Sequence, residues 1–280
     1  MPRPPRSIGI LAPYRPTACL ECLELLHREC ERHGLQAYEL GKCSAGALPT
    51  ATPELLLCLG GDGAILAEAE KAAAAGAIIG GINMGHLGFL SACGRDEIPE
   101  LVQALAAGSY TVEERSMLQV LRSSPGSTPH IALNEVALMR AQTGKMVDVD
   151  VELDGQLLNR YHADGVLVAT PTGSTAYSLS AGGPLLWPSA GVMCLTPICP
   201  HSFTNRSVVL PETVEITIRP RERRGRSGES LIYSLDGRST HPIALDETLT
   251  IRKAPLSLRL LSLPGNSNYA ARLRAKLGWR

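Results

Sequence analysis

The stretch Leu55-Leu56-Leu57-Cys58-Leu59-Gly60-Gly61-Asp62-Gly63-Ala64-Ile65-Leu66 decides the fold of this 280-residue chain. Its first five residues are all apolar, which is typical of a strand buried on both faces. The residues that follow Gly63 are strong helix formers as far as Ala72. We therefore predict a buried strand, a tight turn at residues 60–63 and a helix, which is the local arrangement of a phosphate-binding turn.

The turn combines three glycines with one acid. Without a Cβ, glycine lets a bulky anion approach the backbone, and the helix N-terminus adds N–H groups and a partial positive charge. The carboxylate of Asp62 would repel a phosphate unless it holds a metal or accepts a proton from an attacking hydroxyl. The alternative is that Asp62 only caps the helix, and these four residues leave both readings open. The fingerprint G-x-G-x-x-G is absent here because its third glycine position holds Leu66, and the chain has no Walker G-K-[ST] ending.

Composition limits the class of protein. Hydrophobic residues are 44% of the chain and aromatic residues only 4%, so we expect an aliphatic core. The formal net charge is zero, which gives no reason to expect nucleic-acid binding. No apolar run reaches the roughly 18 residues of a membrane span, and no long apolar region follows the basic N-terminus. We therefore expect no membrane partner and a cytoplasmic location. We interpret the eight cysteines as reduced and mostly buried; a metal site at Cys19, Cys22 and Cys30 is the less favoured alternative.

The first 110 residues alternate strands with helices. Apolar strands are predicted at residues 7–12, 35–40 and 77–82 besides 55–59, with helices at 17–33, 64–76 and 96–108, the last capped by Asp96. This alternation predicts an α/β domain with a parallel sheet and helices on both faces. A second glycine-containing turn, residues 83–90, leaves the carboxyl end of its strand, the edge where such sheets bind ligands. His86 in this turn could contact a phosphate, but a plain loop histidine is the preferred reading.

From about residue 111 the pattern becomes that of short strands. Residues 146–153 alternate apolar and polar side chains, and Asp154-Gly155 predicts a hairpin turn after them. We predict a β-rich domain at residues 111–257. Residues 258–280, with a helix at 269–277, are expected to join the first domain. The basic run at residues 219–226 is better explained as an exposed hairpin loop than as an anion site.

Polar residues gather at two places in the β-rich part. Asn134 and Glu135 interrupt the apolar strand at residues 131–138, and an amide beside a carboxylate suits the paired hydroxyls of a ribose. An ordinary polar pair on an edge strand is the alternative. Asp164 precedes the buried strand Val166-Leu167-Val168-Ala169, which runs into a segment of hydroxyls and glycines as far as Pro184. We predict that this segment is a nucleotide-binding loop that enters a helix near Ala176, with Tyr177 packing on a base or sugar.

Five segments in this order resemble the NAD kinases: residues 60–63, 83–90, 133–136, 164–184 and 195–202. They cover most of the chain, and the Thr-Gly-Ser-Thr-Ala-Tyr block is the most specific of them. The glycine-aspartate motif alone also occurs in diacylglycerol-type lipid kinases and phosphofructokinases. The resemblance implies transfer of the γ-phosphoryl group of ATP to the 2′-hydroxyl of the adenosine ribose of NAD, giving NADP. It also implies Mg²⁺ or another divalent cation, a homodimer or homotetramer, and an active site between the two domains.

The resemblance also implies residue roles. Asp62 would be the proton acceptor, and Gly63 would belong to the binding turn. NAD would be bound by a larger set: Asn134, Glu135, Asp164, Thr175, Ala176, Tyr177, Ser178, Leu179 and Ser180. Lys145 and His162 fall where the family often has arginines that contact the dinucleotide, so His162 is a departure, and Arg238 falls at a further contact position. The metal ligands stay open.

Two other functions fit parts of the sequence. One is a lipid kinase, which the neutral charge, the lack of a membrane-binding amphipathic stretch and the block at residues 164–180 disfavour. The other is a dinucleotide-sensing module without activity, which the retained Asp62 disfavours. Formation of NADP from NAD and ATP would separate all three.

Overall fold

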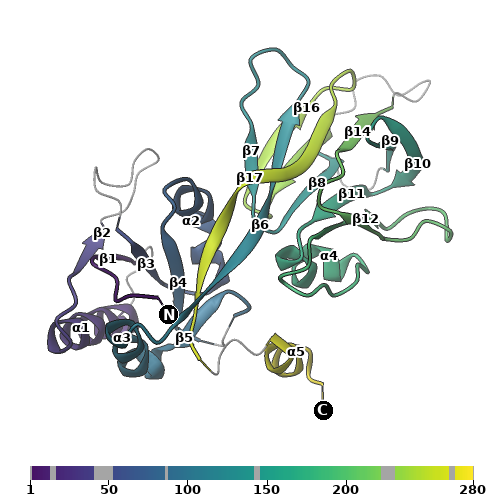
Figure 1. Ribbon diagram of the computed structural model, residues 1–280. Coiled ribbons are helices and arrows are strands. Elements are labelled where there is room, and N and C mark those ends of the chain that lie inside the picture. The colour runs from purple at the N-terminus through teal and green to yellow at the C-terminus, as the bar shows by residue number, and fades with distance from the viewer. Residues whose placement is uncertain are drawn as a thin grey trace. The chain divides into compact units, whose positions relative to one another are not determined.

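The structure is a computed structural model that describes residues 2–12, 17–40, 53–85, 88–141, 146–221, 231–264 and 269–279. The chain divides into two compact units (Figure 1). Unit 1 is Met1–Glu114 with Leu258–Arg280, and unit 2 is Arg115–Ser257. Strands β6 (Thr111–Arg122) and β17 (Leu249–Ser262) each begin in one unit and end in the other.

Unit 1 contains a parallel sheet in the order β17-β4-β3-β1-β2, with β5 also paired to β4. Its strands are β1 (Ile8–Leu11), β2 (Ala37–Leu40), β3 (Leu55–Leu59), β4 (Ile78–Asn83), β5 (Ser91–Gly94) and the end of β17. All five residues of β3 are buried, which confirms the prediction of a strand covered on both faces.

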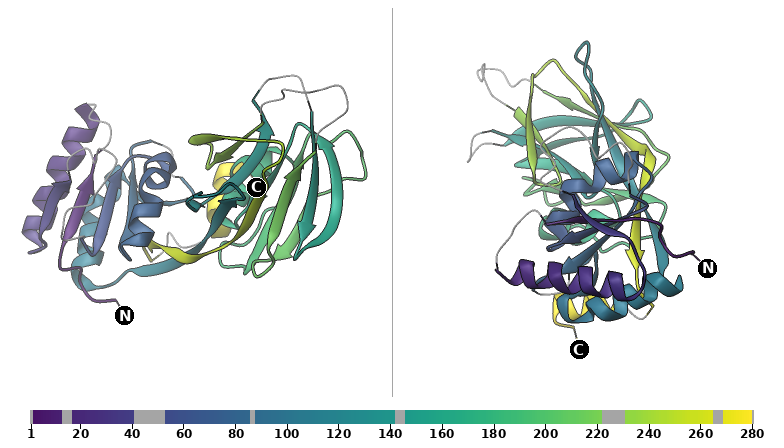
Figure 2. Two further views of the ribbon diagram at one scale, coloured as in Figure 1. Left: turned by 90° about the horizontal axis from the view of Figure 1, so that it is seen from above. Right: turned by 90° about the vertical axis from the view of Figure 1, so that its left-hand side faces the viewer.

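Helices cover both faces of this sheet, as predicted. Helices α1 (Thr17–Arg32) and α3 (Ile98–Ala107) lie on one side and α2 (Asp62–Ala74) on the other (Figure 2). Leu55, Leu57 and Leu59 of β3 belong to the core with α1 and α3. On the opposite face Gly81 makes room for α2, because a Cβ there would lie 2.6 Å from Ile65 Cδ1.

The start of α3 differs from the expectation. A 3₁₀ turn, η1 (Arg95–Glu97), precedes the helix, and Glu97 Oε2 accepts the N–H of Gly94 at 2.7 Å. Asp96 is therefore not the cap. The last helix, α5 (Tyr269–Leu277), matches its predicted range and packs on unit 1. Arg272 Nη1 donates to the carbonyl of Phe89 at 2.7 Å, and the rings of Phe89 and Tyr269 are 6.3 Å apart.

Unit 2 is built from two groups of strands. One sheet has the order β13-β12-β11-β8-β15-β16, and β10-β9-β14 continue to β17 in the other. The strands are β7 (His130–Ala132), β8 (Glu135–Arg140), β9 (Val147–Leu153), β10 (Gln156–Ala163), β11 (Gly165–Ala169), β12 (Val192–Ile198), β13 (Val208–Pro211), β14 (Ile216–Pro220), β15 (Leu231–Leu235) and β16 (Ser239–Ile243). Two short helical turns follow β11: η2 (Thr172–Thr175) and α4 (Tyr177–Ser180).

The core of unit 2 lies between these sheets. Val147, Val149 and Val151 of β9 are buried in it, and the residues between them are only half-buried, as the predicted alternation requires. In β8 the side chains of Val136 and Leu138 enter the same core, whereas Ala137 belongs to a smaller cluster on the other face. No helix in the described part of the chain is long and apolar enough to span a membrane.

Candidate functional site

The glycine turn, residues 60–63, links β3 to α2 in unit 1. Gly60 has φ +154°, and a Cβ there would lie 2.9 Å from Ala64 Cβ, so this position needs glycine. Gly61 and Gly63 are exposed, and a Cβ on Gly63 would meet open space. The helix begins at Asp62, so its N-terminal end, which carries the partial positive charge of the helix dipole, lies at the turn. The N–H groups of Gly60 and Ala64 already donate to the carbonyls of Ile82 at 3.0 Å and Gly61 at 2.9 Å. The turn therefore has the backbone geometry of an anion cradle.

Asp62 does not cap α2, because the N-cap is Gly61 and it carries no side-chain cap bond. The carboxylate instead holds the second turn. Its Oδ2 accepts the N–H of Phe89 at 2.7 Å, and its Oδ1 accepts the N–H of Leu90 at 3.0 Å and the hydroxyl of Ser91 at 3.4 Å. The helix-cap alternative is therefore wrong: Asp62 joins two loops at the carboxyl edge of the sheet.

Gly88 lies against Asp62, and Asn83 lies near Gly61, where a Cβ would be 3.9 Å from Asn83 Oδ1. A Cβ on Gly88 would overlap the Asp62 carboxylate, so only glycine permits this close approach. Asn83, at the end of β4, is buried, and its Oδ1 accepts the N–H of Gly85 at 3.2 Å. His86 lies outside the described residues, so its predicted loop position is not described here.

In unit 2 the backbone of residues 133–135, which we name the Asn-Glu segment, is held from two sides. Asp236 accepts all three of its N–H groups: Leu133 at 3.0 Å, Asn134 at 2.7 Å and Glu135 at 3.1 Å. The carbonyls of Leu133 and Asn134 accept Thr170 Oγ1 at 2.6 Å and Thr170 N at 2.9 Å. The carbonyl of Glu135 accepts the N–H of Asp236 at 2.9 Å. Every backbone polar group of the segment is therefore occupied.

The side chains of Asn134 and Glu135 are buried, and one carboxylate oxygen of Glu135 remains available. Asn134 is 8% exposed and Glu135 4% exposed. Among the described residues, Glu135 Oε2 has no hydrogen-bond partner. Burial first, and the Asp236 carboxylate second, raise the pKa of Glu135 to about 7, while the backbone amide of Tyr177 opposes this. A buried polar atom without a partner is costly and marks a place for a ligand or water, and this burial disfavours the edge-strand alternative.

The loop after β11 packs against this segment. A Cβ on Gly173 would overlap the carbonyl of Asn134, so the close approach depends on glycine. Tyr177 is 37% exposed, and its hydroxyl lies 3.7 Å from Met139 Sδ. Ser178 is fully buried with its hydroxyl 3.4 Å from Thr196 Oγ1, so its side chain supports the loop from inside. The remaining predicted contacts are partly or fully exposed: Thr175, Ala176, Leu179 and Ser180.

The other predicted contact residues are spread over unit 2. His162 Nδ1 lies 2.8 Å from Asp148 Oδ1, and its ring centroid is 5.6 Å from that of His201. Asp164 is exposed at the start of β11, and Arg238 is exposed in the turn after β15. Lys145 lies outside the described residues.

The structure thus groups the predicted residues unequally. Glu135 meets the amide of Tyr177 in unit 2, whereas Asp62 and Gly63 belong to unit 1. Sequence reasoning missed Asp236, Thr170 and Asp148 as partners. The dipeptide Asp236-Gly237 carried only a turn signal, although both residues indeed have positive φ.

Within the described part of the chain, a divalent cation would find few protein ligands. The described residues contain no group of three histidine, cysteine or acidic side chains able to hold a metal. Mg²⁺ commonly binds through substrate phosphates and only one or two carboxylates. Asp62 supplies one carboxylate beside the glycine turn, so the residues present fit a cation that arrives with a nucleotide. Cys19, Cys22 and Cys30 are buried in the core of unit 1.

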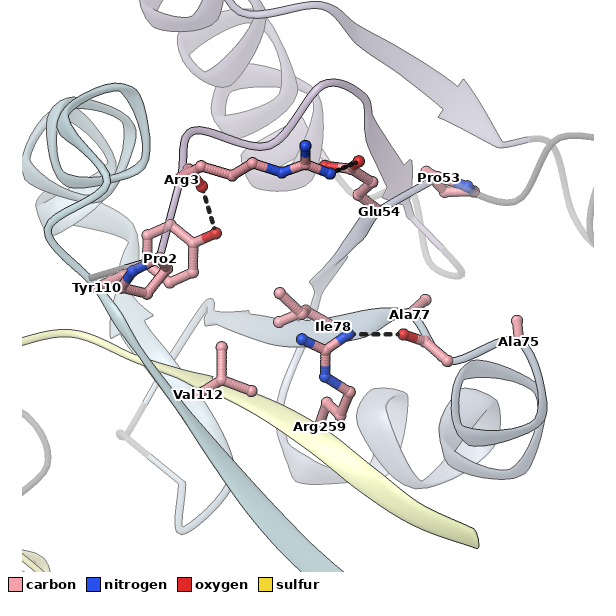
Figure 3. Close-up of a pocket in the computed structure, with 11 residues that line it drawn as sticks. Pro2, Arg3, Pro53, Glu54, Ala75, Ala77, Ile78, Tyr110, Val112 and Arg259 are labelled. Carbon is pink, nitrogen blue, oxygen red and sulfur yellow. Dashed lines mark hydrogen bonds and ion pairs between the residues drawn. The ribbon is translucent and has the colours of Figure 1, made fainter.

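A cavity of about 340 Å³ lies elsewhere in unit 1 (Figure 3). Its wall includes Glu54 and Ile78, which stand at the amino ends of β3 and β4, whereas the glycine turn follows the carboxyl end of β3. Its charged groups already have partners: Arg3 pairs with Glu54 at 2.8 Å, and Arg259 donates to the carbonyl of Gly76 at 2.9 Å. This cavity is therefore not part of the candidate site.

The chain matches the family model of the ATP-NAD kinase N-terminal domain over residues 44–110 and that of the C-terminal domain over residues 133–263. It is 38% identical to an NAD kinase of Koribacter versatilis over 229 residues, which covers 81% of this chain and 78% of the relative. It is 33% identical to an NAD kinase of Azoarcus sp. (strain BH72), covering 98% and 96%.

Two solved structures have the same fold. A yeast NADH kinase complexed with NADH superposes with a TM-score of 0.85 at 24% identity, over 99% of this chain and 88% of that chain. An NAD kinase from Archaeoglobus fulgidus in complex with ATP superposes with a TM-score of 0.77 at 24% identity, over 98% and 99%. At this identity the two structures establish the architecture only.

Proposed function

Because this chain belongs to the NAD kinase family, we propose that it transfers the γ-phosphoryl group of ATP to the 2′-hydroxyl of the adenosine ribose of NAD. The products are NADP and ADP. The observation that carries the proposal is the carboxylate of Asp62, which sits in the glycine turn at the carboxyl edge of the sheet and is fixed by two amides and one hydroxyl.

Asp62 is the proposed proton acceptor. The 2′-oxygen forms a bond to the γ-phosphorus, the bond from that phosphorus to the leaving ADP oxygen breaks, and the hydroxyl proton passes to the carboxylate. Phosphoryl transfer has a loose transition state, so a weak base suffices to orient the hydroxyl and take its proton late. A carboxylate has about four lone-pair sites, so its three contacts to Phe89, Leu90 and Ser91 leave room for the substrate hydroxyl.

The glycine turn and the Asn-Glu segment have different tasks in this proposal. The turn beyond Gly60 and the start of α2 would bind phosphate through the backbone and the positive end of the helix dipole. A divalent cation bound with ATP would neutralise phosphate charge beside Asp62. In unit 2 the side chains of Asn134 and Glu135 bind the ribose of NAD, and Tyr177 packs on a base or sugar. Gly63, Lys145, His162, Asp164, Arg238 and the loop residues Thr175, Ala176, Ser178, Leu179 and Ser180 complete the proposed binding set.

We further propose a cytoplasmic homodimer or homotetramer. The resemblance supports assembly, and the six-stranded sheet of unit 2 ends in β13 and β16, whose edges need cover. The seven described cysteines are free thiols, which suits a reducing compartment. Light scattering should give a multiple of the 29.8 kDa chain mass, and a monomer at working concentration would refute the assembly.

The activity test is direct. The purified protein is incubated with ATP, MgCl₂ and NAD, and NADP is measured with an NADP-specific dehydrogenase; a parallel sample receives diacylglycerol vesicles in place of NAD. We expect NADP and no phosphorylated lipid. Lipid phosphorylation would support a lipid kinase, and NAD binding without NADP formation would indicate a sensing module. Omitting MgCl₂ and adding a chelator tests the proposed cation in the same assay.

A further inference from the structure

We propose that Asp236 is a positioning residue for the dinucleotide: its carboxylate holds the Asn-Glu segment so that the side chains of Asn134 and Glu135 face the ligand with their own backbone fully occupied. This inference rests on the proposed function, because it assigns the segment to NAD binding. It adds a residue that does not itself contact the substrate.

The backbone of the Asn-Glu segment is held by what we name the clamp: Asp236 accepts its three N–H groups, and Thr170 donates to two of its carbonyls. Asp236 Oδ1 accepts the N–H groups of Asn134 at 2.7 Å and Glu135 at 3.1 Å, and Oδ2 accepts that of Leu133 at 3.0 Å. Hydrogen bonds to an ionised acceptor are about twice as strong as neutral ones. Three consecutive amides on one carboxylate therefore fix the direction of the backbone, and with it the direction of both side chains.

A tight turn after β15 presents Asp236 to the Asn-Glu segment. The N–H of Arg238 donates to the carbonyl of Leu235 at 2.9 Å, and the two residues between them have positive φ, +52° at Asp236 and +63° at Gly237. These are the features of a type I′ turn, in which Asp, Asn and Gly are favoured. The turn alone would accept any of these residues, but only Asp supplies two ionised oxygens to the Asn-Glu segment.

The clamp bonds to the backbone of the Asn-Glu segment but not to the carboxylate of Glu135. Thr170 occupies the carbonyls of Leu133 and Asn134 from the other side. Each N–H and C=O of the segment's backbone thus has a partner, whereas Glu135 Oε2 is buried and has no partner among the described residues. The amide and the carboxylate of these two consecutive residues supply the donor and the acceptors that the hydroxyls of a ribose can use.

The charge of Asp236 gives a second readout. Burial raises the pKa of Glu135 and the Asp236 carboxylate raises it further, while the Tyr177 amide lowers it. Burial raises the pKa of Asp236 itself, while its three backbone amides and, last, Arg238 oppose this rise. The other ionisable groups nearby are Asp164 and Cys199, which act on Tyr177. Replacing Asp236 by a neutral residue should therefore shift the ionisation of Glu135 to lower pH, which a purely structural role would not do.

The experiment compares Asp236→Asn with Asp154→Asn. Asp154 is a matched control: it also has positive φ, precedes a positive-φ glycine in a hairpin of unit 2, and accepts one amide, that of Glu215 at 2.9 Å. We measure the dissociation constant for NAD by calorimetry without ATP, kcat and KM, and the pH profile of kcat/KM. For Asp236→Asn we expect NAD binding to weaken about 10- to 100-fold, a similar rise in KM for NAD, a small change in KM for ATP, and a profile displaced to lower pH.

Asp154→Asn should change none of these quantities. If Asp236→Asn does not fold by circular dichroism, Thr170→Val tests the other side of the same clamp and should weaken NAD binding without displacing the pH profile. The inference is overturned if the folded Asp236→Asn protein, or Thr170→Val in its place, binds NAD as the parent does. A parent protein that makes no NADP would instead refute the proposed function, so the two failures are distinguishable.

Discussion

The glycine turn of unit 1 and the Asn-Glu segment of unit 2 both involve one aspartate that accepts backbone amides, but the aspartate has a different place in each. In each, one aspartate accepts consecutive backbone amides of a distant loop: Asp62 holds Phe89 and Leu90, and Asp236 holds the Asn-Glu segment. Asp62 belongs to the glycine turn itself, whereas Asp236 lies in a different turn from the Asn-Glu segment.

This difference separates two modes of recognition. At the glycine turn a Cβ on Gly63 would meet open space, so no side chain there keeps an anion from the backbone, and Asp62 supplies the one carboxylate of the turn. In the Asn-Glu segment the backbone is occupied and the side chains are left to act. Under the proposed function, phosphate would be bound by backbone N–H groups and the ribose by an amide and a carboxylate.

The largest expected effect concerns Asp62. Asp62→Asn keeps the size of the side chain but removes its charge and its basicity. We expect kcat to fall at least about 100-fold, the usual lower range for loss of an acid–base group, while NAD binding survives, because the proposed NAD contacts lie in unit 2. Steady-state kinetics and calorimetry check both parts; near-normal turnover would reduce Asp62 to a loop clamp and make Glu135 the next candidate for the proton acceptor.

A second change tests the same carboxylate without altering it. A Cβ on Gly88 would overlap Asp62, so Gly88→Ala should displace the carboxylate and lower kcat about 10-fold or more. Gly85→Ala is the matched control, because a Cβ there would meet nothing within 4 Å. Equal kcat values for the two variants would show that the position of Asp62 does not matter.

Replacing Tyr177 tests whether its ring contacts NAD beside the Asn-Glu segment. Tyr177→Ala removes the half-exposed ring but keeps the backbone amide that lies at Glu135. Stacking on a base is worth about 1–3 kcal/mol, so KM for NAD should rise roughly 5- to 150-fold with little change in KM for ATP. An unchanged KM in a folded variant would assign the ring to packing alone.

The smallest effect is on stability and depends on pH. The pKa of Glu135 is raised from 4.5 to about 7 in the folded state, so the folded chain binds this proton more tightly than the unfolded chain. The resulting stabilisation is present below pH 4.5 and is lost as the pH rises through 7. Glu135→Gln should therefore raise the free energy of unfolding at pH 8 by on the order of 1–3 kcal/mol.

Urea unfolding at pH 8 and pH 4 measures this difference, and little gain is expected at the lower pH. The same variant should bind NAD more weakly. A loss of stability at pH 8 would mean that Glu135 is satisfied in the folded state, which would weaken the contrast between the two regions.

Local patterns were enough for much of the fold. The apolar run of β3, the alternation of β9 and the helix α5 were predicted at nearly their observed bounds. Strands β5 and β16 were not predicted, because Ser91–Gly94 consists of small residues and Ser239–Ile243 is largely polar, so neither carries an apolar period. Short strands were predicted from residue 111 onward, whereas β17 runs unbroken over 14 residues.

The candidate site was likewise only partly predictable from the sequence. The sequence pointed to Asp62, Asn134 and Glu135, since a carboxylate in a glycine turn and a polar pair in an apolar strand are both exceptions to their surroundings. It could not show that Asp62 reaches residues 27 and 28 positions away, or that Asp236 reaches residues 101 to 103 positions away.

By itself, then, the sequence determined the strand–turn–helix at residues 55–74, the change from α/β to β-rich structure, and the family. These depend on side-chain periodicity, turn chemistry and motif order, which act over a few residues. Only the tertiary structure decided which amides each aspartate accepts, that the backbone of the Asn-Glu segment is fully occupied, and that burial raises the pKa of Glu135. Those properties arise when strands distant in sequence pair side by side and exclude water, and no local pattern contains them.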